Sequence, residues 1–101
     1  MNFIVRPAFW IDLDRHHFWL CKHAGEILAD KWLEAVWQTI FFLRDNPEIG
    51  RLRRDIGHDG VRSWLVSGFS RWTLFYGVRD GFTVLYRVEG GERNLRGLVI
   101  G

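Results

Sequence analysis

Residues 72–88 read WTLFYGVRDGFTVLYRV. Aromatic and β-branched residues lie on both sides of Asp80-Gly81, a pair typical of a two-residue hairpin turn, because both turn residues must adopt a positive φ. The stretch therefore predicts two antiparallel strands joined by a tight turn. With the segment before it, the predicted meander has three strands, at Val61–Val66, Trp72–Val78 and Phe82–Val88, and a turn at residues 67–70.

The two halves of the chain differ in their glycine content. Ten of the eleven glycines lie at or after position 50, and Gly25 alone precedes it, so long helices are expected first. Apolar residues recur there at three- and four-residue intervals, which predicts a helix from Ala8 to the stop at Gly25 and another from Glu26 to Arg44. Two apolar stripes are predicted: Phe9, Leu13 and Leu20 with Trp10 and His17 in the first helix, and Leu28, Trp32, Val36, Ile40 and Leu43 in the second.

A short strand is predicted near each end of the chain. Phe3–Arg6 is β-prone and ends at Pro7, and Leu95–Ile100 would add a final strand to the meander. The predicted order is β-α-α-β-β-β, with an optional last β. For these strands to share one core, the N-terminal strand must join the antiparallel meander sheet, which packs on the two-helix hairpin. Residues 1–101 are thus predicted to form a single α+β domain.

The composition excludes several classes of protein. Hydrophobic residues make up 48% of the chain and six residues are tryptophan, which is typical of a globular protein and not of a disordered one. No apolar run reaches the roughly 18 residues that span a bilayer, and the first residues lack the features of a signal peptide. Cys21 is the single cysteine, so no internal disulfide can form and a cytoplasmic location is expected. Some tryptophans are expected to stay partly exposed and to form a partner surface.

No common catalytic or metal-binding pattern occurs. His16 and His17 are adjacent and point about 100° apart on a helix, so they cannot both bind one ion. The single cysteine offers no zinc-site spacing, and no nucleotide-binding fingerprint is present. We therefore predict no metal, no cofactor and no conventional active site. The candidate residues have simpler interpretations: His16 and His17 as helix-surface or boundary residues, Asp12 and Asp14 as first-turn charges favoured by the helix dipole, and Cys21 as a small buried hydrophobe.

Arginine is concentrated in the second half of the chain. Residues 1–50 carry five basic and seven acidic side chains, a net charge of −2, whereas residues 51–101 carry nine arginines and five acids, a net charge of +4. Residues 50–63, GRLRRDIGHDGVRS, hold four of these arginines. A guanidinium group can bind carboxylate or phosphate with two hydrogen bonds. The candidate basic patch consists of Arg51, Arg53, Arg54 and Arg62, with Arg87 and Arg93 added if the strand phase brings them near.

Five short stretches, in order and on the predicted β-α-α-β-β-β pattern, carry a family resemblance. They are Arg6-Pro7-Ala8 with Asp12-Leu13; Asn46-Pro47-Glu48-Ile49-Gly50; Gly60-Val61-Arg62-Ser63; Leu74-Phe75-Tyr76; and Tyr86-Arg87-Val88 with Gly91-Glu92-Arg93-Asn94-Leu95. Together they resemble the RelE/ParE superfamily of type II toxin–antitoxin toxins, in particular its ParE-like (plasmid stabilisation) branch. Glu89-Gly90 departs from that branch, which usually has Leu-His at this point.

The resemblance implies a toxin that is neutralised by a cognate antitoxin and inhibits an essential bacterial target, DNA gyrase in the ParE-like branch. RelE-like members instead cleave mRNA on the ribosome with basic and tyrosine side chains. The positions that match those side chains are Ser63, Leu65, Thr73, Arg93 and Val99, of which Arg93 alone keeps the expected residue type. An isolated arginine lacks an acid–base partner, so the sequence favours a non-enzymatic toxin. A ribosome-dependent endonuclease with a different basic set and an inactive orphan binding domain remain the alternatives.

Three interpretations of the arginines stay open at this point. They could bind acidic residues of the antitoxin, they could bind nucleic acid, or they could pair locally with Asp55 and Asp59. Arg62 and Arg87 lie within predicted strands, and we expect at least one of them to bind a carboxylate or backbone carbonyl groups. A homodimer and a toxin–antitoxin hetero-oligomer are both compatible with the resemblance.

Overall fold

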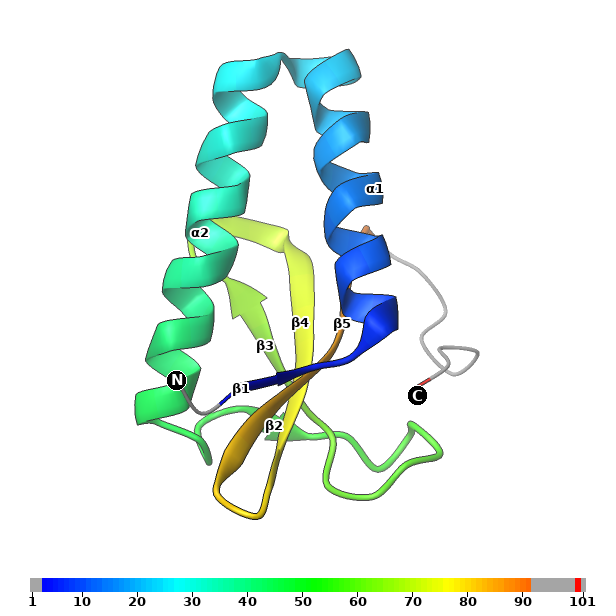
Figure 1. Ribbon diagram of the computed structural model, residues 1–101, viewed down its shortest axis with the longest axis vertical. Helices are drawn as coiled ribbons and strands as arrows, with labels where there is room; N and C mark the ends of the chain where they lie inside the picture. The colour runs from blue at the N-terminus through cyan, green and yellow to red at the C-terminus, as the bar shows by residue number, and fades with distance from the viewer. Residues whose placement is uncertain (1–2, 92–99, 101) are drawn as a thin grey trace.

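The structure is a computed structural model that describes residues 3–91 and 100, and it confirms the predicted α+β order of elements (Figure 1). A helical hairpin covers one face of a five-stranded sheet. The elements are β1 (Phe3–Val5), α1 (Pro7–Ala24), α2 (Glu26–Asp45), β2 (Arg51–Leu52), β3 (Arg62–Val66), β4 (Phe69–Arg79) and β5 (Phe82–Gly90). None of the helices in this part of the chain is long and apolar enough to cross a membrane.

The sheet has the strand order β1-β5-β4-β3-β2, so the two ends of the described chain meet at β1 and β5. β1 runs parallel to β5, and the other neighbouring strands are antiparallel. The turn between β4 and β5 is the predicted one, since Asp80 has a φ of 53° and Gly81 a φ of 81°. Positive φ at both positions matches the twist of the flanking strands.

The two helices lie side by side and antiparallel, and the end of the hairpin at Gly25 projects beyond the sheet (Figure 1). Pro7 is at the first helical position of α1, where its missing N–H costs no hydrogen bond. Gly25 separates the helices with a φ of 91°, a conformation that side chains rarely adopt. The backbone N–H of Ala29 then bonds to the Gly25 carbonyl at 3.1 Å and starts α2.

The main core lies between the helices and the sheet. Four of the five residues predicted on the α2 stripe are fully buried: Trp32, Val36, Ile40 and Leu43. Leu28 is the exception, because it lies near the projecting end of the hairpin and is 40% exposed, while Ala29 is buried there. On α1, Phe9, Leu13 and Leu20 are buried as predicted, whereas Trp10 is 46% exposed and the His17 side chain 30% exposed.

A β-bulge decides which residues of β5 face this core. Phe75 pairs with Arg87 and Tyr76 with Leu85, so Tyr86 is an extra residue on β5. The bulge reverses the alternation, and Leu85 and Val88 both enter the core. A second, smaller cluster occupies the opposite face of the sheet and consists of Ile56, Val61, Phe75, Val84 and Tyr86, with Ile100 packed against it.

The structure differs from the prediction at several element ends. Arg51–Leu52 forms the short strand β2 instead of a loop, because both residues pair with β3. β4 begins at Phe69, inside the segment predicted as a turn, and β5 continues to Gly90. The predicted last strand lies outside the described residues except for Ile100.

Candidate functional site

The sheet face away from the helices carries a row of four residues from four strands. Arg51 pairs with Ser63, Ser63 with Phe75, and Phe75 with Arg87. Residues paired directly across strands share a face, and Phe75 belongs to the cluster opposite the helices. A surface pocket of about 390 Å³ opens beside Arg51, lined by Ile49, Arg51, Arg53, Ser63, Trp64, Leu65 and Thr73.

Arg53 is the arginine of this pocket that has a local partner. Its guanidinium group donates two hydrogen bonds to the Asp55 carboxylate, at 2.9 Å and 2.6 Å, and lies 5.6 Å from the centre of the Phe75 ring. The bonds raise the pKa of Arg53 and lower the pKa of Asp55 to about 2. Local pairing, one of the three interpretations of the arginines, therefore applies to Arg53.

Arg51 and Arg54 differ from Arg53 in this respect. Both side chains are exposed, and neither forms an ion pair within residues 3–91 and 100. We call Arg51, Arg53 and Arg54 the arginine group. Two of its three charges are available to a partner, while the third is held in place over the sheet.

Arg62 lies next to Ser63 on β3 and therefore points to the other face of the sheet. Its Nη1 donates to the carbonyl groups of Glu48 and Gly50 at 3.1 Å and 2.8 Å. The Tyr76 hydroxyl donates to the Pro47 carbonyl and accepts from the Gly50 N–H, both at 2.9 Å. A Cβ at Gly50 would overlap the Tyr76 ring, which explains the glycine. Arg62 thus fixes the exit from α2, as we expected for at least one strand arginine.

Arg87, at the β5 end of the row, is the second structural arginine. It donates to both oxygens of Asp12 on α1, at 2.6 Å and 2.8 Å, and to Glu89 at 2.9 Å. Arg15 also pairs with both carboxylates, at 3.1 Å and 3.2 Å. Helix α1 begins at Pro7 and has no acidic residue in its first turn, so the interpretation of Asp12 and Asp14 as first-turn charges was wrong; Asp12 is instead buried, at 1% exposure.

Asp12 and His16 together occupy the outer edge of β5 beyond the end of β1. The Val88 N–H donates to Asp12 Oδ2 at 3.2 Å, and His16 Nε2 donates to the Val88 carbonyl at 3.0 Å. These side chains are one helical turn apart on α1 and provide the hydrogen bonds that a neighbouring strand would make. His16 is at a boundary, as predicted, and its burial lowers its pKa, although Glu89 opposes this effect.

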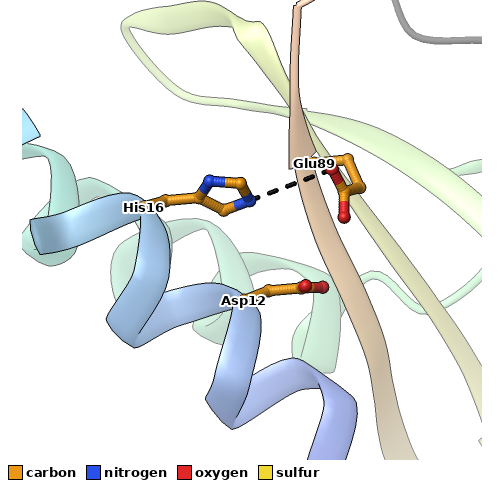
Figure 2. A group of neighbouring side chains, drawn as sticks. All are labelled: Asp12, His16 and Glu89. Carbon is orange, nitrogen blue, oxygen red and sulfur yellow. Dashed lines mark ion pairs between the residues drawn. The ribbon is translucent and has the colours of Figure 1, made fainter. Parts of the chain in front are cut away.

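Asp12, His16 and Glu89 point toward one another, and their nearest donor atoms lie within 4.8 Å (Figure 2). This spacing could hold a metal ion. However, the two carboxylates are already neutralised by two guanidinium groups, and His16 Nε2 is bonded to a backbone carbonyl. A cation would have to displace both arginines. We therefore interpret the group as an ion-pair cluster that joins α1 to β5.

The positions that match the RelE-like ribonuclease residues can be located for three of five. Ser63, Leu65 and Thr73 line the pocket beside Arg51, and none of them titrates near neutral pH. Arg93 and Val99 lie outside the described residues. A further arginine that no sequence motif had identified, Arg71, is exposed on β4 two residues before Thr73 and therefore on the same face.

Comparison with known proteins gives a family and a fold. The family model described as ParE toxin of type II toxin-antitoxin system, parDE, matches residues 3–95. A chain in the solved structure of the chromosomal ParDE TA system from P. aeruginosa is 18% identical, with a TM-score of 0.74 over 91% of this chain and 97% of that chain. No curated protein matches the sequence. Because the family model covers nearly the whole chain, the protein belongs to the ParE toxin family of type II toxin–antitoxin systems.

Proposed function

We propose that this ParE-family toxin acts in the cytoplasm without catalysis, by binding DNA gyrase, and that a cognate antitoxin neutralises it. The observation that carries the proposal is the lining of the pocket beside Arg51. Its polar side chains are two arginines, a serine and a threonine, together with the indole N–H of Trp64. These side chains offer no group for proton transfer, so the pocket supports a toxin that acts without catalysis.

Cleavage of RNA by attack of a ribose hydroxyl needs a base to accept the proton and an acid to protonate the leaving oxygen. A base must be unprotonated at working pH. The Asp55 carboxylate raises the pKa of Arg53, so this guanidinium stays charged. Ser63 and Thr73 are weak acids and bases on their own. These properties support inhibition by binding over cleavage.

The target can be tested by inducing the chain in a bacterial host and following labelled thymidine and labelled methionine in parallel pulses. Gyrase inhibition predicts an early loss of thymidine incorporation while translation continues. Early loss of methionine incorporation would reject this target and favour ribosome-dependent cleavage. Normal growth with neither effect would favour an inactive binding domain.

We assign the arginine group to the antitoxin and not to the target. Arg51 and Arg54 are exposed and positively charged, and antitoxin segments that fold on binding can supply carboxylates to such a surface. The double variant Arg51→Glu/Arg54→Glu should lower antitoxin affinity at least about tenfold, since each contact changes from attraction to repulsion. Arg79→Glu is the control, because Arg79 is also exposed on the same sheet.

The same variants separate the two partners. If the double variant keeps full antitoxin affinity but no longer inhibits purified gyrase, the arginine group contacts the target. If it behaves as the Arg79→Glu control in both assays, the group has no partner role.

A further inference from the structure

The outer edge of β5 is covered over most of its length. β1 pairs with residues 83–85, and the Arg6 N–H bonds to the Leu85 carbonyl at 3.0 Å. After the bulge, Asp12 and His16 bond to the N–H and carbonyl of Val88. The next residue with its backbone groups on this edge has no such cover from residues 3–91 and 100.

That residue is Gly90. Backbone groups in an antiparallel pair alternate between the partner strand and the free edge. Val88 faces the edge, and the Gly91 N–H bonds inward to the Arg71 carbonyl at 2.9 Å, so the N–H and carbonyl of Gly90 point outward. Within the part of the chain that the structure describes, neither group has a hydrogen-bond partner. Among the described residues, none pairs with the outer edge of β5 at Gly90.

A pocket of about 410 Å³ lies directly beside this open position. It is lined by His16, Trp19, Leu20, Arg71, Trp72, Glu89, Gly90 and Gly91. Trp19 is 51% exposed on one wall. Trp72 lies so close to Gly90 that a Cβ there would be 2.6 Å from its ring, which requires glycine at this position. The pocket thus combines an aromatic floor, an aromatic wall and an accessible backbone.

The charge at the pocket is positive at its rim. Glu89 is 2% exposed and bound by Arg15 and Arg87, so its charge is matched inside the protein. Arg71 is exposed and forms no ion pair with the residues that the structure describes. The Arg15 side chain bonds to Glu89 at 3.2 Å and is 53% exposed. A ligand with an apolar group and a carboxylate therefore complements this pocket.

We propose that this pocket binds an extended segment of the antitoxin. One residue of the segment pairs with the N–H and carbonyl of Gly90, an apolar side chain inserts between Trp19 and Trp72, and an acidic side chain binds Arg71. Main-chain pairing supplies affinity in such contacts, and the side-chain pocket supplies specificity. The inference rests on the proposed neutralisation by an antitoxin and adds where one antitoxin segment binds.

The test uses the small protein encoded by the gene adjacent to that of this chain, with both proteins purified as a complex and as separate chains. Arg71→Glu and Trp19→Ala should each weaken the complex at least tenfold. Both side chains are exposed, so the variants should remain folded, as near-UV circular dichroism will show. Arg79→Glu, a charge reversal at the other end of β4, should leave the affinity within twofold of the original.

Hydrogen exchange gives a second readout that does not depend on substitution. The amide of Gly90 should exchange rapidly in the isolated chain and at least tenfold more slowly in the complex. If the adjacent protein binds but Arg71→Glu, Trp19→Ala and Gly90 exchange are all unaffected, the pocket assignment is wrong and antitoxin binding stands. If the adjacent protein does not bind the original chain, antitoxin neutralisation and the pocket assignment both fail.

Discussion

Asp12 is a buried residue of α1 that bonds to both the side chain and the backbone of β5. Its carboxylate accepts hydrogen bonds from Arg87, from Arg15 and from the backbone of Val88, and it is almost completely buried. A buried carboxylate is tolerated because its charge is paired and its oxygens are bonded. This one side chain joins the first helix to the last described strand.

We therefore expect Asp12→Ala to lower the free energy of unfolding by about 3 kcal/mol, because it removes the buried carboxylate that accepts hydrogen bonds from Arg87 and from the Val88 N–H. Asp14 is the matched control, since it is exposed two residues away on the same helix. Asp14→Ala should change the free energy by less than about 0.5 kcal/mol. Urea denaturation of both variants measures the difference. Equal stability of the two variants would contradict the structural role of Asp12.

His16 makes the free energy of unfolding depend on pH. Burial lowers its pKa in the folded chain below its ordinary value of 6.5. In the window between the lowered pKa and 6.5, the unfolded chain binds more protons than the folded chain, so stability must fall as the pH falls below 6.5. The free energy of unfolding should therefore decrease between pH 7.5 and pH 5.5, by up to about 1.4 kcal/mol per pH unit.

The His16→Gln variant should show a weaker decrease over this pH range than the original chain. His23→Gln is the control, since its imidazole is exposed and bonds only to a backbone carbonyl of its own helix. Urea titrations at several pH values give the slopes. If the free energy of unfolding changes equally with pH in the original chain and in His16→Gln, His16 does not contribute to the pH dependence.

At the scale of elements, the β4–β5 hairpin and the helical hairpin are specified in different ways. The β4–β5 turn is local, because Asp80 and Gly81 adopt the left-handed conformations that a two-residue turn requires. The contact between α1 and β5 is not local, since Asp12 and Val88 are 76 positions apart. Side chains of α1 take the place of a strand there, so the helix fixes where the open sheet edge begins.

Gly81→Ala tests the local specification of the β4–β5 hairpin. No atom lies within 4 Å of an added Cβ at this position, so the cost arises from the positive φ alone and should be about 1–2 kcal/mol. Gly57 is the control, because it has equal space around an added Cβ but no positive φ. Gly57→Ala should be neutral or slightly stabilising in thermal denaturation. A similar loss in both variants would contradict the turn geometry.

At the scale of the whole molecule, helix α1 has large apolar side chains that are exposed in the described part of the chain. Trp10, Ile11, Phe18 and Trp19 on α1 are between 46% and 65% exposed, as expected for some of the tryptophans. Ile11 and Phe18 are seven residues apart and lie on the same side of the helix. Contiguous exposed apolar surface of this kind favours association with a partner or with another copy of the chain.

The isolated chain should accordingly self-associate as its concentration rises, and sedimentation velocity can measure this. The double variant Ile11→Lys/Phe18→Lys should be monomeric over a wider range of concentration. Val78→Lys is the control, because Val78 is 53% exposed on β4, away from α1. A chain that is monomeric at every concentration, with or without the substitutions, would show that this surface does not self-associate.

Local sequence signals specify the two helices and the β4–β5 hairpin, because each of these elements depends on neighbours in the chain. Helical spacing located α1 and α2, and Asp80-Gly81 located the hairpin. The same spacing identified Trp32 and Ile40 as core residues, since burial on an amphipathic helix follows its period. The order of helices and strands and the fold class follow from these local signals and from the short connections between the elements.

Which polar residues meet depends on how distant segments of the chain pack together. Strict alternation along β5 would place Arg87 in the helix-facing core with Leu85, but after the bulge at Tyr86 Val88 takes that place and Arg87 pairs with Phe75, where its guanidinium group bonds to Asp12. A bulge depends on pairing between strands, so no period within one strand reveals it. For the same reason the open edge at Gly90, the separation of Arg62 from Arg51, and the burial of Asp12 emerge only when distant segments pack together.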